Sequence, residues 1–335
     1  MNKPDFYTQL TTDWSLGSLI CPPQPVSGGY MHKMFRLDTT AGSYAVKLLN
    51  PEVMNRPAAL SNYQKAEALE SVLERHGLPI VAAMSCNGSK MQCIQDQYYY
   101  LFPWVEHQAL PWDAISVGHC RTIGGLLAKL HSLPCGEIAP ETSGPDLFSF
   151  DWQAMAQQTQ KHCPELAATL AAALPLLEKA QASYNDAVNA LPSIHCICNA
   201  DMDSKNVLWQ GSDPLMIDLE CLEIGNPVND LVQLSLSWAG GVLCQLNFNQ
   251  LTAFLRAYRE VSSLQPMDWT ALSGLGFAWL DWLNYNLRRA CGLTIDTPDE
   301  RTIGIQESRN TLDRICYYAQ MQPQVAQQFQ RAMEG

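Results

Sequence analysis

The sequence changes character once, near Pro103, and this change constrains the fold more than any other feature. Before Pro103, short apolar runs alternate with turn residues, which predicts strands rather than long helices. The expected strands are residues 26–37, 43–50, 81–84 and 91–102, with hairpin turns at 38–42 and 87–88. One helix is expected at 57–76, stopped by Gly77 with Pro79 beyond it. This part therefore predicts an antiparallel sheet with one helix.

After Pro103 the apolar residues recur at the spacing of a helix, as in Ile123, Leu127 and Leu130. Strand character returns only briefly, between residues 192 and 218. The expected helices are residues 113–131, 151–162, 164–189, 231–238, 249–262, 270–291 and 302–319. The prediction is an α+β protein with two lobes, residues 1–103 and a larger, mostly helical part at 104–335.

Composition narrows the classes of partner. The chain has 21 Lys and Arg against 33 Asp and Glu, a formal charge of −12, so nucleic acid and anionic membrane surfaces are not expected partners. The start lacks a secretory signal and no run of about 18 apolar residues occurs, which predicts a cytoplasmic protein. The 12 cysteines are expected to be reduced, although Cys196 and Cys198 leave a metal-binding thiol site as a third interpretation.

The most informative stretch surrounds a predicted hairpin, residues 207–209 and 215–217. Asn206 precedes its first strand and Asp218 follows its second, so both should emerge at one open end. Asp201 lies five residues before Asn206, on the loop that enters that end. Carboxylate and amide oxygens suit a hard cation such as Mg²⁺. The same residue types also cap turns, so this triplet alone fits a purely structural role as well.

Lys47 adds a charge on a strand with apolar neighbours, an expensive place for an ammonium unless an anion meets it. The following helix offers Glu67 and Glu70. A strand lysine held by a helix glutamate is one way to aim a charge at nucleotide phosphates.

Six short motifs in one order give the chain a family resemblance over about residues 20–320. They are residues 27–33, 44–47, 100–105, 125–131, the Asp201-x4-Asn206 loop with Asp218, and 225–231. In this the sequence resembles the aminoglycoside phosphotransferase and choline kinase superfamily, which has the protein-kinase-like fold.

The resemblance implies roles for the residues that match. Asp201 would orient or deprotonate the acceptor hydroxyl, and Asn206 and Asp218 would hold Mg²⁺ on the nucleotide. Lys47 would contact phosphates and Glu67 would hold Lys47, with Glu70 as the second choice.

The nucleotide, ATP with GTP as a second option, would be held largely by backbone groups. Phosphate contacts are implied for Ser27, Gly28 and Gly29, and adenine contacts for Phe102, Trp104 and Val105. His32 and Lys33 either reach phosphate or are solvated at a hairpin tip.

The loop departs from the family pattern, because Asn199-Ala200 replaces the usual His-Gly or His-Arg before Asp201. The alternative is therefore a catalytically inactive pseudokinase that binds a nucleotide or metabolite. Retention of Asp201, Asn206, Asp218 and Lys47 favours an active enzyme.

The acceptor is expected to be a small, cationic alcohol such as an aminoglycoside, choline or another amino alcohol. The candidate acceptor residues are Asp203, Glu220, Trp282 and Tyr285. Carboxylates and aromatic faces suit a cation, although aromatic residues at this spacing also fit core packing. The sequence leaves the acceptor's identity and the oligomeric state open.

Overall fold

The computed structural model describes residues 5–26, 32–135, 145–262, 264–294 and 297–334. The chain forms two compact units, and each is considered by itself. The N-terminal unit comprises residues 1–109 and 206–223, and the helical unit comprises residues 110–205 and 224–335. Because residues 206–223 pack with the N-terminal unit, the units do not follow one break in the sequence. The boundary expected at residue 103 stays a prediction.

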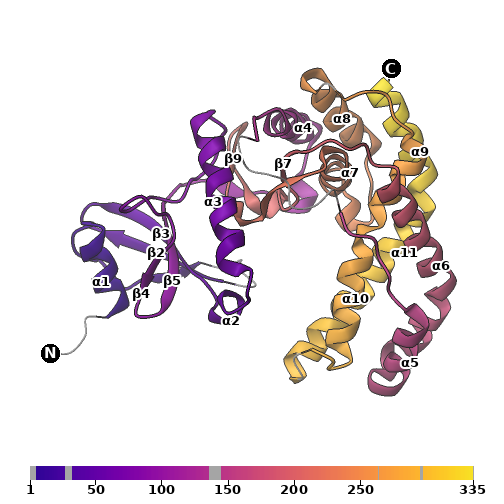
Figure 1. Cartoon of the computed structure of the whole chain (residues 1–335), viewed down its shortest axis with the longest axis horizontal. Coiled ribbons are helices and arrows are strands. Elements are labelled where there is room, and N and C mark those ends of the chain that lie inside the picture. The colour runs from indigo at the N-terminus through magenta and orange to yellow at the C-terminus, as the bar shows by residue number, and fades with distance from the viewer. Residues whose placement is uncertain (1–4, 27–31, 136–144, 263, 295–296, 335) are drawn as a thin grey trace. The chain divides into compact units, whose positions relative to one another are not determined.

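The N-terminal unit is built on an antiparallel sheet of five strands in the order β1-β2-β3-β5-β4 (Figure 1). The strands are β1 (Gln24–Val26), β2 (Lys33–Thr39), β3 (Gly42–Leu48), β4 (Gln92–Ile94) and β5 (Gln97–Pro103). The helices are α1 (Phe6–Asp13), α2 (Pro51–Met54) and α3 (Ala59–Arg75). A second sheet pairs β6 (Gln108–Ala109), β8 (Val207–Gln210) and β9 (Asp213–Met216) in the order β6-β8-β9.

The two faces of the five-stranded sheet enter different cores. Tyr99 and Leu101 of β5 pack in a cluster with Leu10 of α1, whereas Tyr100 packs with Tyr63 of α3. This division follows from the alternation of side chains along a strand. Apolar residues on both faces explain why β5 reads as a continuous apolar run in the sequence.

Two strand predictions for this unit are wrong. Residues 81–84 form no strand, because their N–H groups bind three different partners: Val81 donates to the Met216 carbonyl, Ala83 to the Glu70 carboxylate and Met84 to the Leu101 carbonyl. The expected strand at 91–102 is two strands, β4 and β5, joined at Gln95-Asp96, where both residues have positive φ. Asn87-Gly88 does form a turn, but the residues on either side of it, Cys86 and Ser89, form only an isolated bridge and not a hairpin of two strands.

The helical unit carries α4 to α11 (Figure 1). Its helices are α4 (Val117–His131), α5 (Trp152–His162), α6 (Pro164–Asn189), α7 (Pro227–Trp238), α8 (Phe248–Val261), α9 (Trp269–Leu272), α10 (Trp279–Ala290) and α11 (Pro298–Glu334). Short 3₁₀ segments here are η1 (Trp112–Ala114), η2 (Ser204–Asn206), η4 (Gly241–Leu243) and η5 (Ser273–Ala278), whereas η3 (Leu219–Cys221) belongs to the N-terminal unit. Strand β7 (Cys196–Asn199) pairs with β10 (Leu222–Gly225). The chain returns from the N-terminal unit to the helical unit within β10, at residue 224.

The α+β prediction is confirmed, with an antiparallel sheet in the N-terminal part and a larger helical part. The bounds of α5 and α6 agree with the sequence to within one residue. The helix expected at 270–291 is instead broken into α9, η5 and α10, and α11 continues to Glu334 through Pro323. In the described part of the chain, no helix has the length and apolar character to cross a membrane.

Helices α4 and α8 approach closely at Gly124. A Cβ atom built on Gly124 would lie 2.2 Å from the carbonyl oxygen of Phe254, whereas one on Gly125 meets nothing within 4 Å. The two neighbouring glycines therefore differ in packing while sharing the same helix.

We expect Gly124→Ala to destabilise the protein by about 1–3 kcal/mol or more, because the backbone of α8 must move. The matched control Gly125→Ala should stabilise it by about 0.5–1 kcal/mol through helix propensity. Urea unfolding of both variants measures the difference. Equal effects of the two substitutions would contradict the close packing.

Candidate active site

Lys47 is the centre of the site in the N-terminal unit. Its Nζ lies 2.5 Å from Oδ1 of Asp218 and 2.5 Å from Oε2 of Glu220. Lys47 is 6% exposed, so its ammonium depends on these carboxylates rather than on water. The strand lysine and the aspartate after the β8–β9 hairpin are thus brought together, as the sequence-based hypothesis requires.

The charges at this centre stabilise one another. Burial disfavours the Lys47 ammonium, but Asp218 and Glu220 outweigh it and raise the pKa of Lys47. Burial likewise opposes the Glu220 carboxylate, yet His32 and Lys47 lower its pKa. Nδ1 of His32 accepts from the backbone N–H of Asn50, so its Nε2, 3.5 Å from Glu220, carries the proton. His32 is also buried, so the prediction that it is solvated at a hairpin tip is wrong.

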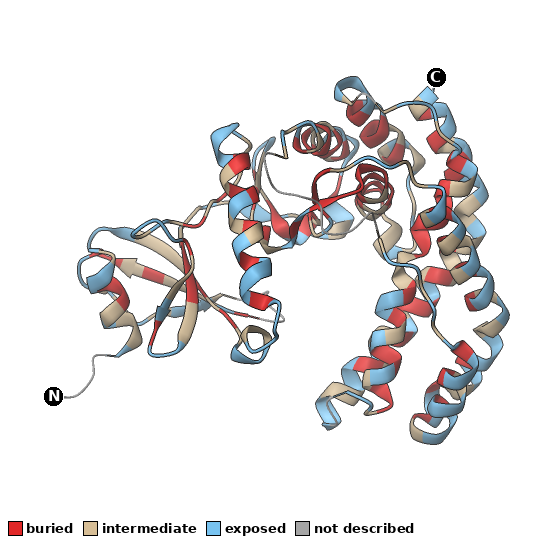
Figure 2. Ribbon diagram, in the orientation of Figure 1, coloured by how far each residue is buried: buried red, intermediate tan, exposed pale blue. Residues whose placement is uncertain are grey.

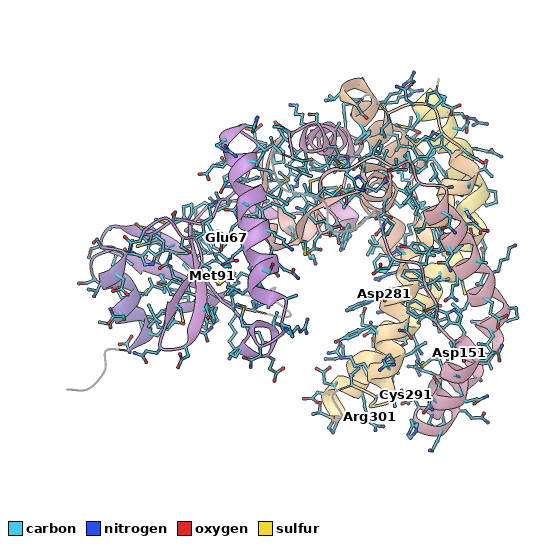
Figure 3. All side chains as sticks on the ribbon, in the orientation of Figure 1. Glu67, Met91, Asp151, Asp281, Cys291 and Arg301 are labelled. Atoms are coloured by element: carbon cyan, nitrogen blue, oxygen red, sulfur yellow. The ribbon has the colours of Figure 1, made fainter. Side chains whose placement is uncertain are left out.

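The expected partnership of Glu67 with Lys47 is not what the structure shows. Oε1 of Glu67 accepts from the Tyr100 hydroxyl at 2.7 Å and from the Met91 backbone N–H at 3.2 Å (Figure 3). Tyr100 stands opposite Lys47 in the β3–β5 register, which places its hydroxyl between strand and helix. The second choice, Glu70, is bound to Lys90 at 2.5 Å.

The hairpin that carries Asn206 and Asp218 is confirmed. Val207 pairs with Met216, and the Ile217 N–H donates to the Asn206 carbonyl at 2.9 Å, so Asn206 and Asp218 flank the open end. Asp218 has φ of +58°, a left-handed conformation that is uncommon for residues other than glycine. The extended backbone of the hairpin therefore ends at this residue.

The predicted nucleotide contacts are only partly described. Ser27, Gly28 and Gly29 lie outside the described residues. Phe102 lines a cavity of about 30 Å³ together with Lys47 and Asp218. The Trp104 backbone N–H donates to the Ser43 carbonyl at 3.1 Å, so that donor is already engaged. Val105 is half-buried beside it.

In the helical unit, one face of α7 orders the loop that carries Asp201. Oδ2 of Asp230 accepts from the Asn199 N–H at 3.0 Å, the Ser237 hydroxyl donates to Asp203 at 2.7 Å, and the Trp238 indole donates to the Met202 carbonyl at 2.9 Å. Residues seven and eight apart share one side of a helix, so a single face makes all three contacts. Most of α7 is buried (Figure 2), which fixes this face in place.

Asp201 is held by neighbours on the same loop. Its carboxylate lies 3.0 Å from the Lys205 ammonium, and its backbone N–H donates to the Asn199 side chain at 3.3 Å. Asn199, which stands where the family usually has histidine, therefore still supports the loop through its side chain. The Asp201 side chain is 31% exposed and can be reached from solvent.

A buried histidine strengthens the same loop support. His131 of α4 places Nε2 3.1 Å from Asp230 and Nδ1 2.8 Å from the Tyr258 hydroxyl. Burial disfavours the imidazolium, but hydrogen bonds to Asp230 and Cys198 outweigh it and raise the pKa of His131 to about 9. Ligand atoms of His131, Cys196 and Cys198 lie within 4.8 Å of one another. Both ring nitrogens are already hydrogen-bonded, which argues against the metal-binding thiol interpretation.

The helical unit also contains a cavity of about 220 Å³ beside the Asp201 loop. Ala200 and Asp203 line it from that loop, and Asp281 and Trp282 line it from α10, where Figure 3 labels Asp281. Burial raises the pKa of Asp203. Two of the predicted acceptor residues, Asp203 and Trp282, thus share one cavity.

The other two predicted acceptor residues do not line this cavity. Glu220 belongs to the Lys47 centre, because the turn after Asp218 returns its side chain toward β3. Tyr285 is 45% exposed and stacks on Trp282, with ring centroids 5.4 Å apart. Sequence reasoning missed Arg314 of α11, which lines the cavity, because helical spacing does not show which neighbour a polar residue meets.

With this geometry established, comparison with known proteins identifies the family. Residues 23–270 match the model of the phosphotransferase enzyme family. The chain belongs to this family. A search of curated proteins finds no match.

Solved structures of low sequence identity share the fold of this phosphotransferase. A spectinomycin phosphotransferase, solved with ADP and spectinomycin, has a TM-score of 0.67 at 13% identity, over 93% of this chain and 98% of its own. A choline/ethanolamine kinase family protein from Mesorhizobium loti has a TM-score of 0.62 at 16% identity, over 98% and 99%. An ethanolamine kinase from Plasmodium vivax has a TM-score of 0.58 at 12% identity, over 94% and 89%.

The family match confirms the predicted resemblance and the predicted enzyme class, a phosphotransferase, and the solved structures confirm the predicted fold. The residue roles, the nucleotide, the metal and the acceptor stay predictions.

The His131–Asp230 pair predicts a pH dependence of stability. A pKa raised from an ordinary value near 6.5 to about 9 stabilises the folded state fully below pH 6.5, and this contribution is lost as pH rises through 9. We expect Asp230→Asn to lower stability on the order of 3 kcal/mol at pH 6 and much less at pH 9.5.

Thermal unfolding of wild type, Asp230→Asn and His131→Gln between pH 6 and 9.5 measures this. Both variants should lose the same part of the wild-type pH slope. A wild-type slope retained in either variant would show that the pair is not charged in the folded protein.

Proposed function

We propose that this phosphotransferase transfers the γ-phosphoryl group of ATP, as its magnesium complex, to a hydroxyl of a small cationic molecule, with GTP as a second nucleotide. The observation that carries the proposal is the 2.5 Å contact of Lys47 with Asp218. These residues lie 171 positions apart in the chain and match the phosphate-binding lysine and metal-binding aspartate of the family.

The nucleotide side of the proposal rests on the N-terminal unit. Lys47 offers an ammonium to phosphate oxygens, and Phe102 lines the same cavity with an aromatic face. Because that cavity has room for about one water molecule, nucleotide binding must rearrange its charged lining. The 2.5 Å contact with Glu220 is the one that phosphate would replace on Lys47.

The residues at the hairpin end suit Mg²⁺. Asn206 and Asp218 offer an amide oxygen and a carboxylate at one edge, the hard donors that Mg²⁺ takes together with phosphate and water. When bound, the ion would neutralise charge on the transferred phosphoryl group. The residues present therefore fit the group that the family implies.

The acceptor side rests on the cavity beside Asp201. Its volume of about 220 Å³ is below the roughly 300–1,000 Å³ of sites for drug-sized ligands, which favours a small amino alcohol over a multi-ring aminoglycoside. The carboxylates of Asp203 and Asp281 line it and would attract an ammonium. One face of Trp279 is already covered by Arg314, at 4.8 Å, so Trp282 is the better aromatic contact for a cation.

In the proposed reaction, the acceptor oxygen forms a bond to the γ-phosphorus as the bond to the bridging oxygen of the leaving diphosphate breaks. The hydroxyl proton passes to the Asp201 carboxylate, and the products are a phosphate monoester and ADP. The Lys205 ammonium, 3.0 Å from the Asp201 carboxylate, orients it before transfer.

We expect Asp201→Ala to lower kcat by about 10²–10⁴, as for loss of a positioned base, while ATP affinity changes little. The control Asp186→Ala removes an exposed carboxylate from α6 and should leave kcat unchanged. ADP release with a panel of amino alcohols and aminoglycosides measures kcat, and titration calorimetry with ATP and Mg²⁺ measures affinity.

Wild-type turnover in Asp201→Ala would refute the role of this residue. Nucleotide binding by the wild-type protein without transfer to any acceptor in the panel would instead favour the pseudokinase.

A further inference from the structure

The cavity beside Asp201 holds a cation as well as carboxylates. Arg314 lines it from α11, together with Asp203 from the loop and Asp281 from α10. A site made only for a cationic alcohol gains nothing from an arginine, because the two positive charges repel each other. The presence of Arg314 therefore carries information about the acceptor beyond its ammonium group.

Arg314 is held in a defined orientation. Its guanidinium lies 4.8 Å from the ring centroid of Trp279, and its Nε donates to the Val242 carbonyl at 3.0 Å. Stacking and one anchored donor fix the plane of the guanidinium, so little entropy is lost when a ligand binds it.

The outer edge of this guanidinium is available to a ligand. Among the residues that the structure describes, the Val242 carbonyl is the one hydrogen-bond acceptor of Arg314, and no carboxylate lies within 4.0 Å of it. The two carboxylates of the cavity are thus not used as its ion-pair partners, and Asp203 instead accepts from the Ser237 hydroxyl. The two terminal NH₂ groups form the planar fork that binds a carboxylate through parallel hydrogen bonds.

We infer that the acceptor is zwitterionic: a hydroxy amino acid whose carboxylate binds Arg314, whose ammonium binds Asp203 and Asp281, and whose hydroxyl receives phosphate. This inference rests on the proposed function and names its substrate class. The cavity of about 220 Å³ suits a molecule of amino-acid size. The product would be the O-phospho amino acid together with ADP, the hydroxyl proton passing to Asp201.

The experiment compares acceptors that differ only in the carboxylate. L-serine, L-threonine and L-homoserine are each assayed beside their carboxamides and beside the amino alcohols ethanolamine, 1-amino-2-propanol and 3-amino-1-propanol. ADP release with ATP and Mg²⁺ gives kcat and KM, and thermal shift gives binding without turnover. We expect the best amino acid to have a KM at least about 10-fold below that of its carboxamide.

Variants of α11 assign the effect to Arg314. Arg314→Gln should raise KM for the amino acid by about 10–100-fold and leave KM for the carboxamide within about threefold. Arg314→Lys keeps the charge without the fork and should fall between wild type and Arg314→Gln. Arg309→Gln, at an exposed position of the same helix that does not line the cavity, is the matched control and should match wild type.

The outcomes separate this inference from the proposed function. Carboxamides or amino alcohols used as well as amino acids, or equal effects of Arg314→Gln on acid and amide, would overturn the zwitterionic acceptor and leave the kinase intact. Amino acids that stabilise wild type but not Arg314→Gln, without transfer to any acceptor, would refute the kinase while showing that the cavity binds a zwitterion through Arg314. If wild type neither binds nor phosphorylates any amino acid, the inference is overturned. The comparison of acid with amide uses wild type alone, so it remains a valid test even if the variants fail to fold.

Discussion

A lysine buried on a strand must be matched by anions, and this requirement organises the N-terminal unit. The ammonium of Lys47 finds them on residues 218 and 220, which lie 171 and 173 positions further along the chain. The β8–β9 hairpin therefore has to pack with the sheet for β3 to be stable, because a buried charge without a partner is costly. The same condition places the carboxylate of Asp218 against Lys47, so the contact that stabilises β3 is also the centre of the candidate site.

The helical unit solves a similar problem with a helix instead of a hairpin. The loop around Asp201 lies outside the regular elements, and one face of α7 supplies its partners: Asp230 and Trp238 bind its backbone, and Ser237 binds the Asp203 side chain. Because α7 is buried, these partners cannot rotate away. Asp230 is in turn fixed by His131, so the position of a loop on the surface depends on a charge pair in the interior.

The sequence predicted what local chemistry decides. Turn residues between two apolar runs marked the β8–β9 hairpin, and the register then required Asn206 and Asp218 to share one end. Pro164 at the first helical position marked the start of α6. Contacts between distant residues were harder to predict. Glu67 and Glu70 were both plausible partners of Lys47, but in the structure Glu67 binds Tyr100 and Glu70 binds Lys90. No sequence pattern distinguishes which of several carboxylates will be nearest in space.

Asp203 shows why the cavity beside Asp201 was only half predicted. Its place two residues after Asp201 marked it, but Arg314 lies more than a hundred residues away on a helix whose polar positions look alike in the sequence. In the folded protein burial raises the pKa of Asp203, its carboxylate accepts from the Ser237 hydroxyl, and the charges of Lys205 and Arg314 partly oppose the effect of burial. Arg314 likewise is kept with a carbonyl rather than a carboxylate. Opposite charges thus line one cavity, and a direct ion pair between them would add little to the stability of the fold, because desolvation offsets the attraction. The presence of both Asp203 and Arg314 is explained if a ligand that carries both charges binds between them. The distance between the two side chains then reflects the distance between the ammonium and the carboxylate of the acceptor.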